Sequence, residues 1–274
     1  MQKKFTLAII ITMLIPFLLK AEWVPMNNST KQIAPNVTLI SNDISSTILT
    51  IEISGFDLKD LNADGQEYQV VDLLTESFVT KPGMPALPYI AKTLAIPDQA
   101  AVSFEILETG NVQTFQNISL APARESWLEG YPETPYIKDE NAYSNNDIFP
   151  GSLIDIEPPS IFRDFRITRV SVYPIRYNPV KKELEVTTSL TVKINYVSGD
   201  VVNPKNTVKK PIAPSFGQLY QSFIFNYQNV LDDNYGGKEN GHELMLCIMP
   251  DEFYNELSNI CRMETSKWNR YSYY

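Results

Sequence analysis

Cysteine and histidine are scarce in this chain: of its 274 residues, two are cysteines and one is a histidine. Both cysteines, Cys247 and Cys261, lie within the last 28 residues. The first 246 residues therefore contain no disulfide, and a hydrophobic core must stabilise them. A bridge between the two cysteines is disfavoured by their sequence contexts, which are typical of small buried apolar residues.

These three residues do not predict a Cys–His catalytic dyad, in which nucleophile and base lie within hydrogen-bond reach. His242 and Cys247 are five positions apart on one predicted strand. Their side chains would point to opposite faces, about 16 Å apart. Cys261 follows the apolar Ile260 on a predicted helix. We therefore expect no catalytic residue in this sequence.

Metal, cofactor and nucleic-acid sites are not indicated either. The sequence has no cluster of His and Cys with metal-ligand spacing, and no glycine-rich phosphate loop. The acidic pairs Asp232-Asp233 and Asp139-Glu140 are interpreted as solvated loop charges rather than calcium ligands. A net charge of −9 gives no electrostatic basis for binding nucleic acid or an anionic membrane surface. We expect no cofactor, no metal and no nucleic-acid partner.

The N-terminus is typical of a secretory signal peptide. Residues 1–4 include two lysines, and the largely apolar segment of fifteen residues that follows is too short for a usual membrane span. Cleavage between Ala21 and Glu22 would remove residues 1–21. The net charge would fall from −9 to −12, because residues 1–20 carry three lysines and no acid. A signal anchor is the alternative. We expect a secreted or cell-surface protein without membrane attachment after cleavage.

Alternation of apolar and polar residues predicts antiparallel β structure. Between Leu184 and Ile194 the apolar residues occupy even positions, with Thr188 as the polar interruption. A turn at Tyr177-Asn178-Pro179 separates this run from an earlier β-rich run, Ile167–Tyr177, so the two runs are predicted to form a hairpin. Other short β-like runs are predicted at Val37–Ile40, Ser46–Ile53, Tyr68–Leu74, Ala91–Ile96 and Ala101–Leu107. Their spacing favours a mainly β, antiparallel β-sandwich.

Two proline-rich segments interrupt this pattern. Thr80–Pro88 is predicted to be an extended strap, either a recognition element or an ordered crossover that covers a sheet edge, and we favour the crossover. Residues 120–160 form a loop of a length that usually indicates function or disorder. Its aromatic residues argue against disorder: Trp127, Tyr131, Tyr136 and Phe149. The alternative to a functional loop is that these rings only pin a long loop to the body.

The last part of the chain has a different pattern. Leu244–Met249 is a continuous apolar run, as in a strand buried on both faces. Pro250-Asp251-Glu252 suits the first turn of a helix, and apolar residues then recur on one helical face. Residues 232–274 therefore predict the opening strand and helix of an α/β domain, too short to complete such a fold.

Several runs together resemble the propeptide of the gingipain family, which comprises secreted bacterial cysteine endopeptidases. The similarity spans about residues 45–270, and it is the order and spacing of the runs that carry it. The matching residues are Pro82–Pro88, Ile96-Pro97, Ala121-Pro122, Phe149–Gly151, Arg163-Asp164, Tyr177–Pro179 with Lys182, Asn226-Tyr227 and Lys238–Gly241.

The resemblance implies a division of the chain into three parts. These are a signal peptide at residues 1–21, a β-sandwich prodomain at 22–231, and a caspase-like α/β fragment of a catalytic domain at 232–274. It implies that the prodomain assists the folding and blocks the cleft of its own protease catalytic domain, the expected partner. The family's catalytic His and Cys would lie beyond Tyr274, so the chain as it stands would be inactive. The full-length precursor would be a cysteine-type endopeptidase.

Two positions depart from the arginine-specific members of this family. In those members a basic residue after the Ala-Pro pair is thought to plug the specificity pocket. Here that register falls on Leu128 or Glu129, and the nearest basic residue is Arg124. Maturation cleavage there follows an arginine, whereas the equivalent bond here is Leu231–Asp232. One hypothesis is an apolar protease pocket that takes Leu128 as a pseudo-substrate. The alternative is that neither leucine enters a pocket and another enzyme performs the maturation.

Two further functional classes are weighed against the precursor. A free-standing exported β-sandwich would be a binding or adhesion module without a protease. The predicted strand and helix after Asp232 favour the precursor, because such a module has no need of them. A small self-contained enzyme is disfavoured by the missing nucleophile–base pair.

Overall fold

The computed structural model describes residues 21–26, 29, 31–79, 81–207, 212–231 and 250–253. Residues 1–20 of the predicted signal peptide lie outside this part of the chain, as does nearly all of the predicted α/β fragment. Several residues discussed above also lie outside it, among them Asp232, His242, Cys247 and Cys261. Of the predicted C-terminal helix, only a 3-10 turn at Asp251–Phe253 (η1) is described.

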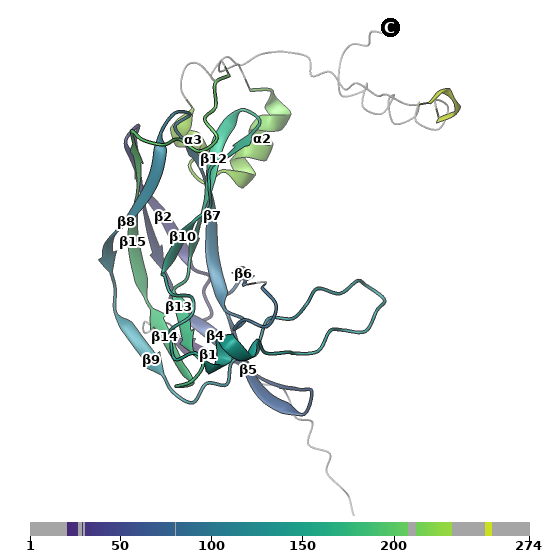
Figure 1. Cartoon of the computed structure of the whole chain (residues 1–274). Helices are drawn as coiled ribbons and strands as arrows, with labels where there is room; N and C mark the ends of the chain where they lie inside the picture. The colour runs from purple at the N-terminus through teal and green to yellow at the C-terminus, as the bar shows by residue number, and fades with distance from the viewer. Residues whose placement is uncertain are drawn as a thin grey trace, which may run out of the picture.

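The described residues are mainly β (Figure 1). The strands are β1 (Ala21–Pro25), β2 (Asn36–Asn42), β3 (Ser46–Glu52), β4 (Gly55–Ala63), β5 (Gln66–Asp72), β6 (Ser77–Phe78), β7 (Pro88–Ile96), β8 (Ala101–Thr109), β9 (Val112–Phe115), β10 (Ile154–Ile156), β11 (Ser160–Phe162), β12 (Phe165–Val172), β13 (Ile175–Asn178), β14 (Glu183–Thr187) and β15 (Ser189–Val197). The helices are α1 (Glu140–Ser144), α2 (Pro214–Phe223) and α3 (Tyr227–Val230). Among the described residues, no helix has the length and apolar character needed to cross a membrane.

Within the described ranges, the strands form four sheets whose strand pairs are all antiparallel. The two larger sheets have the orders β2-β3-β15-β8 and β10-β12-β7-β6, with β11 beside β12. The smaller sheets are β1-β4-β5 and β13-β14-β9. Five of the predicted β-like runs coincide with β2, β3, β5, β7 and β8. The prediction of antiparallel β structure is confirmed.

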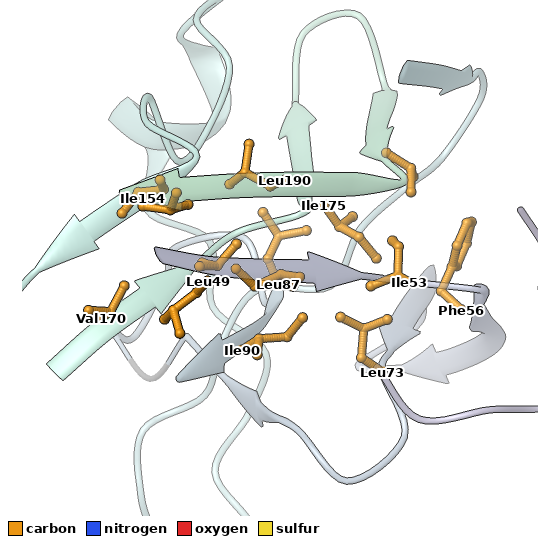
Figure 2. Close-up of a cluster of buried hydrophobic side chains, with 14 of the residues drawn as sticks. Leu49, Ile53, Phe56, Leu73, Leu87, Ile90, Ile154, Val170, Ile175 and Leu190 are labelled. Carbon is orange, nitrogen blue, oxygen red and sulfur yellow. The ribbon is translucent and has the colours of Figure 1, made fainter. Parts of the chain in front are cut away.

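One hydrophobic core joins the two larger sheets, as in a sandwich. Leu49 of β3 and Leu190 of β15 lie on one side of it, and Ile90 of β7 and Val170 of β12 lie on the other (Figure 2). These side chains are at most 3% exposed, so each contributes about 1.5–3 kcal/mol by burial. The even-numbered residues from Leu184 to Ile194 are all buried, including the polar Thr188, as the alternation predicted.

The predicted hairpin is shorter than the alternation suggested. β13 pairs with β14, and the Asn178 side chain accepts a hydrogen bond from Lys181 N across the turn (3.0 Å). The strand then divides at Thr188, and β15 pairs with β3 and β8 of another sheet. Thr188 bonds through its backbone to Asn111 and to Ile53 instead. The alternation continues unchanged across this break, because both sheets bury the same face of the run.

A second apolar cluster lies where the two C-terminal helices pack on the β7–β12 sheet. It comprises Ala95, Phe165, Ile167, Tyr220, Ile224 and Tyr227. Asn226, between the helices, is fully buried. Its amide oxygen accepts from Ala95 N and its Nδ2 donates to Ala95 O, both at 2.8 Å. Nδ2 also donates to Asn42 Oδ1 of β2 (2.8 Å), so one side chain ties this segment to both larger sheets.

Candidate functional site

The long loop predicted to be functional contains an arm, residues 124–138, that projects from the body (Figure 1, teal loop). Its entry and exit are joined by backbone hydrogen bonds to the proline-rich strap. Gly83 N donates to Ala123 O (2.9 Å), and Asp139 N donates to Gly83 O (3.0 Å). Ala123 N also donates to Met84 O (2.7 Å). One strap residue thus clamps both ends of the arm.

Gly83 fits this clamp because it has no side chain. Its φ of +81° lies in the left-handed region, and a Cβ there would approach Asp139 N to 3.0 Å. The described part of the strap, residues 81–88, thus makes defined backbone contacts, while its covering of a sheet edge stays a prediction. Its contacts extend that prediction, because the strap holds the base of the arm. The sequence signal for this role was the Pro-Gly-Met-Pro run, but nothing in the run identified its partner.

Arg124 forms the neck of the arm. Its guanidinium lies 4.4 Å from the ring centroid of Trp127 and 4.5 Å from that of Tyr136. Its Nη1 also donates to Glu133 Oε2 (2.7 Å) and to Thr134 O (3.3 Å). The side chain is 19% exposed. The structure thus places this predicted candidate at the neck of the arm, where its stacking partners Trp127 and Tyr136 are two of the aromatic residues noted in the sequence.

The exit side of the arm rests on the β4–β5 hairpin. Tyr136 N donates to Asp64 Oδ2 (2.8 Å), and its ring lies 6.0 Å from that of Tyr68. The hairpin turn has φ of +52° at Asp64 and +73° at Gly65, as a type I′ turn requires. Lys138 Nζ lies 5.0 Å from the Tyr68 ring centroid. These contacts fix the direction in which the arm leaves the body.

Asp139, the first residue of the acidic pair noted in the sequence, has a structural role. Asp139 is the N-cap of α1, and its Oδ1 accepts from Asn141 N (2.9 Å) and Ala142 N (3.2 Å). Across the described ranges, no group of three or more His, Cys, Asp or Glu residues could hold a metal ion.

The tip of the arm is a turn that exposes apolar side chains. Tyr131 N donates to Leu128 O (3.1 Å), and Gly130 has the positive φ (+87°) of the third position in a type II turn. Leu128 is 73% exposed and Tyr131 is 70% exposed, and Glu129 is exposed between them. Leu128 and Glu129 are therefore presented at the tip, while Arg124 is held at the neck.

The two predicted cleavage positions lie on different elements. Leu231 follows α3 directly and is 37% exposed, and its predicted partner Asp232 is outside the described residues. Ala21 and Glu22 begin β1 and pair with Lys59 and Leu58 of β4. Cleavage after Ala21 would leave Glu22 and the rest of β1 in place. Both cleavage sites stay predictions.

Solved structures with the same antiparallel fold show the class of protein to which this chain is similar. A solved complex of the pro- and mature domains of RgpB from Porphyromonas gingivalis matches with a TM-score of 0.63 and 22% sequence identity, over 70% of this chain and 97% of that one. A structure on the zymogenic latency of gingipain K from the same organism matches with a TM-score of 0.56 and 16% identity, over 66% of this chain and 100% of that one. The fold is that of a gingipain prodomain.

The family model Propeptide_C25 matches residues 27–228, and the chain belongs to this family. Gingipain R2 of P. gingivalis is 24% identical over 82% of this chain and 30% of its own length. Gingipain R1 of that organism is 27% identical over 82% of this chain and 22% of its own length. Lys-gingipain is 21% identical over 53% of this chain. The chain spans less than a third of the length of these curated relatives. The resemblance to gingipain propeptides is thereby confirmed.

Proposed function

We propose that residues 22–231 are the inhibitory prodomain of a secreted gingipain-like cysteine endopeptidase precursor, whose catalytic domain begins at 232. The prodomain would assist folding of that catalytic domain and block its cleft until it is cleaved off. Membership of the C25 propeptide family supports this, as do fold neighbours described as a pro- and mature-domain complex and as a latent zymogen. Export would use the predicted signal peptide at 1–21.

The observation that carries the proposal is an arm with a fixed base and an exposed apolar tip. Its base is clamped by Gly83, and its neck is closed by Arg124 stacked between two rings. A loop that is already ordered loses little conformational entropy when it enters a cleft, so more of its contact energy becomes affinity. Such a loop suits a protein that must occupy an active site without being released quickly.

In this proposal Leu128 enters an apolar specificity pocket as a pseudo-substrate side chain. Leu128 lies at the tip turn and is 73% exposed. Arg124, the basic candidate, is only 19% exposed. Removing Arg124 from the neck to fill a pocket would break its stacking and its bond to Glu133. Leu231, at the proposed maturation bond, presents the same side chain, so one pocket could serve both positions.

The first experiment measures the peptidase specificity of the full-length precursor, using matched peptides that carry leucine or arginine before the cleaved bond. We expect the leucine peptide to be the better substrate. A strong preference for arginine would refute the apolar pocket. If the purified precursor has no peptidase activity even after maturation conditions, the free-standing binding module becomes the better description.

The second experiment compares two charge-introducing variants of the precursor on the same arm. Leu128→Asp should weaken inhibition about 30-fold or more, as loss of a contact worth about 2 kcal/mol does. Ile137→Asp is the matched control, because Ile137 is similarly exposed (67%) but lies away from the tip turn. Equal inhibition constants for Leu128→Asp and the unmodified precursor would contradict the plug.

A further inference from the structure

We propose that a groove along β7 and β12 is a second docking surface for the catalytic domain, separate from the arm. This inference rests on the proposed function, since it assigns a further surface to the same partner. The groove encloses about 800 Å³. It is lined by Ala91–Thr93 and Ile167–Arg169, with Thr75–Ser77 at one side and Gln221–Phe225 at another.

The chemistry of the lining suits another protein surface. Lys92 and Arg169 supply positive charge, and Glu76 and Glu157 supply negative charge. Two aromatic side chains at the rim are unusually exposed, Phe223 at 47% and Phe225 at 36%. Aromatic residues with arginine are enriched in protein interfaces, whereas a nucleic-acid site would carry one sign of charge.

The charged groups of the groove keep capacity for further contacts. Lys92 Nζ lies 6.0 Å from the ring centroid of Phe225, and Arg169 Nε lies 4.0 Å from Glu157 Oε1. Arg169 Nη2 donates to Tyr89 OH (2.9 Å). Burial raises the pKa of the half-buried Glu76, and attraction to Lys92 opposes that rise. The contact between Lys92 and Phe225 and the ion pair between Arg169 and Glu157 are both long, so a partner can engage the same charged groups.

The position of the groove identifies its occupant. On one side, Thr75–Ser77 leads within a few residues into the strap that clamps the arm. On the other side, Gln221–Phe225 leads through α3 to Leu231, where the proposed catalytic domain begins. In Figure 1 the arm and the two helices lie toward opposite ends of β7. A domain joined at Leu231 that also receives the arm must pass the surface between these two points, and the groove lies there.

Because the catalytic domain would be connected to the prodomain through Leu231, even a weak contact with the groove is sufficient to keep it docked. A domain tethered a few residues from its docking surface has an effective concentration in the millimolar range. The groove therefore needs only moderate affinity to be occupied in the precursor. After cleavage of the chain this advantage would be lost, and the groove contact would weaken.

Chemical labelling of lysine amines tests the contact directly. The chain of residues 1–274 is compared with the full precursor, in which the catalytic cysteine is replaced by alanine so that it stays uncleaved. We expect labelling of Lys92 to fall about fivefold or more in the precursor, as burial in an interface predicts. Lys181, exposed on the β13–β14 turn, is the matched control and should label equally in both.

Charge reversal provides the second measurement. Lys92→Glu in the active precursor should raise the initial peptidase activity, measured before cleavage, about tenfold and more so at low salt. Lys181→Glu should leave it unchanged. If Lys92 were labelled equally in both samples and the precursor were still inactive, the docking role of the groove would be refuted while the proposed function would stand. A fully active uncleaved precursor would refute the proposed function itself. Concentration-dependent protection of Lys92 in the 274-residue chain would assign the groove to a second copy, and would also overturn the proposal.

Discussion

The arm and the C-terminal helical segment are both attached to the β-sheet body, but they differ in where their apolar side chains go. The C-terminal segment buries Tyr220, Ile224 and Tyr227 in a cluster with the sheet, although Phe223 and Phe225 stay exposed at the groove. The arm leaves Leu128 and Tyr131 more than two-thirds exposed. A segment that buries its apolar side chains is part of the fold. A segment that is held at its base yet exposes its apolar side chains suits contact with another molecule, as proposed above for the arm.

The attachments differ in the same way. The C-terminal segment is held through a buried side chain, Asn226, within a network that reaches both sheets. The arm is held by backbone bonds at Gly83 and by the surface stacking of Arg124. Substitutions in the first should therefore lower the stability of the whole domain, and those in the second should loosen the arm alone.

The largest effect is expected for Asn226→Ala. It removes three hydrogen bonds and leaves Ala95 N and Ala95 O without their buried partner. We expect the free energy of unfolding to fall by about 2–5 kcal/mol, measured by urea denaturation. Asn229→Ala, on the exposed side of α3, is the control and should change it by less than about 0.5 kcal/mol. Similar values for the two variants would show that the segment is not part of the cooperative fold.

The same network predicts a loss of stability at high pH. Tyr196 lies within hydrogen-bond distance of Thr47, which donates to Asn42, and burial raises the pKa of Tyr196 to about 12 from its usual 10.0. Above pH 10 the unfolded chain loses this proton while the folded chain keeps it, so the stabilisation present below pH 10 is lost as the pH rises through 12. The expected loss is about 2–3 kcal/mol.

Denaturation with urea at a series of pH values from 9 to about 12 measures this loss. Tyr196→Phe has no proton to lose at this position, so its unfolding free energy should fall less steeply over the same range. Burial also raises the pKa of Tyr177, which contributes to the slope that remains in the variant. A parallel slope in the two proteins would contradict the assignment to Tyr196.

On the arm side, Gly83→Ala is expected to have an intermediate effect. The new Cβ would meet Asp139 N at 3.0 Å in a backbone conformation that alanine disfavours, which together cost about 1–3 kcal/mol. Gly65→Ala is a close control, because Gly65 also has a positive φ (+73°) but has nothing within 4 Å of the added Cβ. We expect Gly83→Ala to be the more destabilised in thermal unfolding and to open the arm to proteolysis. Equal proteolysis of the two variants would contradict the role of Gly83 as the clamp of the arm.

The comparison also shows what the sequence could predict. Short β-like runs separated by turn signals located β2, β3, β5, β7 and β8, even though β8 is largely exposed. Length, proline content and aromatic residues located the arm as a candidate site. The division at Thr188 was not predictable, since the apolar period is the same on both sides of it. Gly83 and Asn226 act through partners at distant sequence positions, Asp139 and Ala95, and a periodic pattern carries no information about such pairs.

The smallest effect on global stability, and the sharpest contrast with Asn226, is expected for Arg124→Ala. Its ion pair with Glu133 is screened by solvent, because the Glu133 side chain is 67% exposed. Stacking on two rings adds modest energy, so unfolding should change by about 1 kcal/mol. Cleavage by chymotrypsin after Trp127 or Leu128 should nevertheless become several-fold faster, since the neck no longer holds the arm together. Trp127→Ala lacks one of these two cleavage sites, but it removes one side of the same stack, so cleavage after Leu128 should become faster in this variant as well. If both variants resisted cleavage like the unmodified chain, the backbone clamp alone would hold the arm, and Arg124 would regain its place as a candidate for insertion into a cleft.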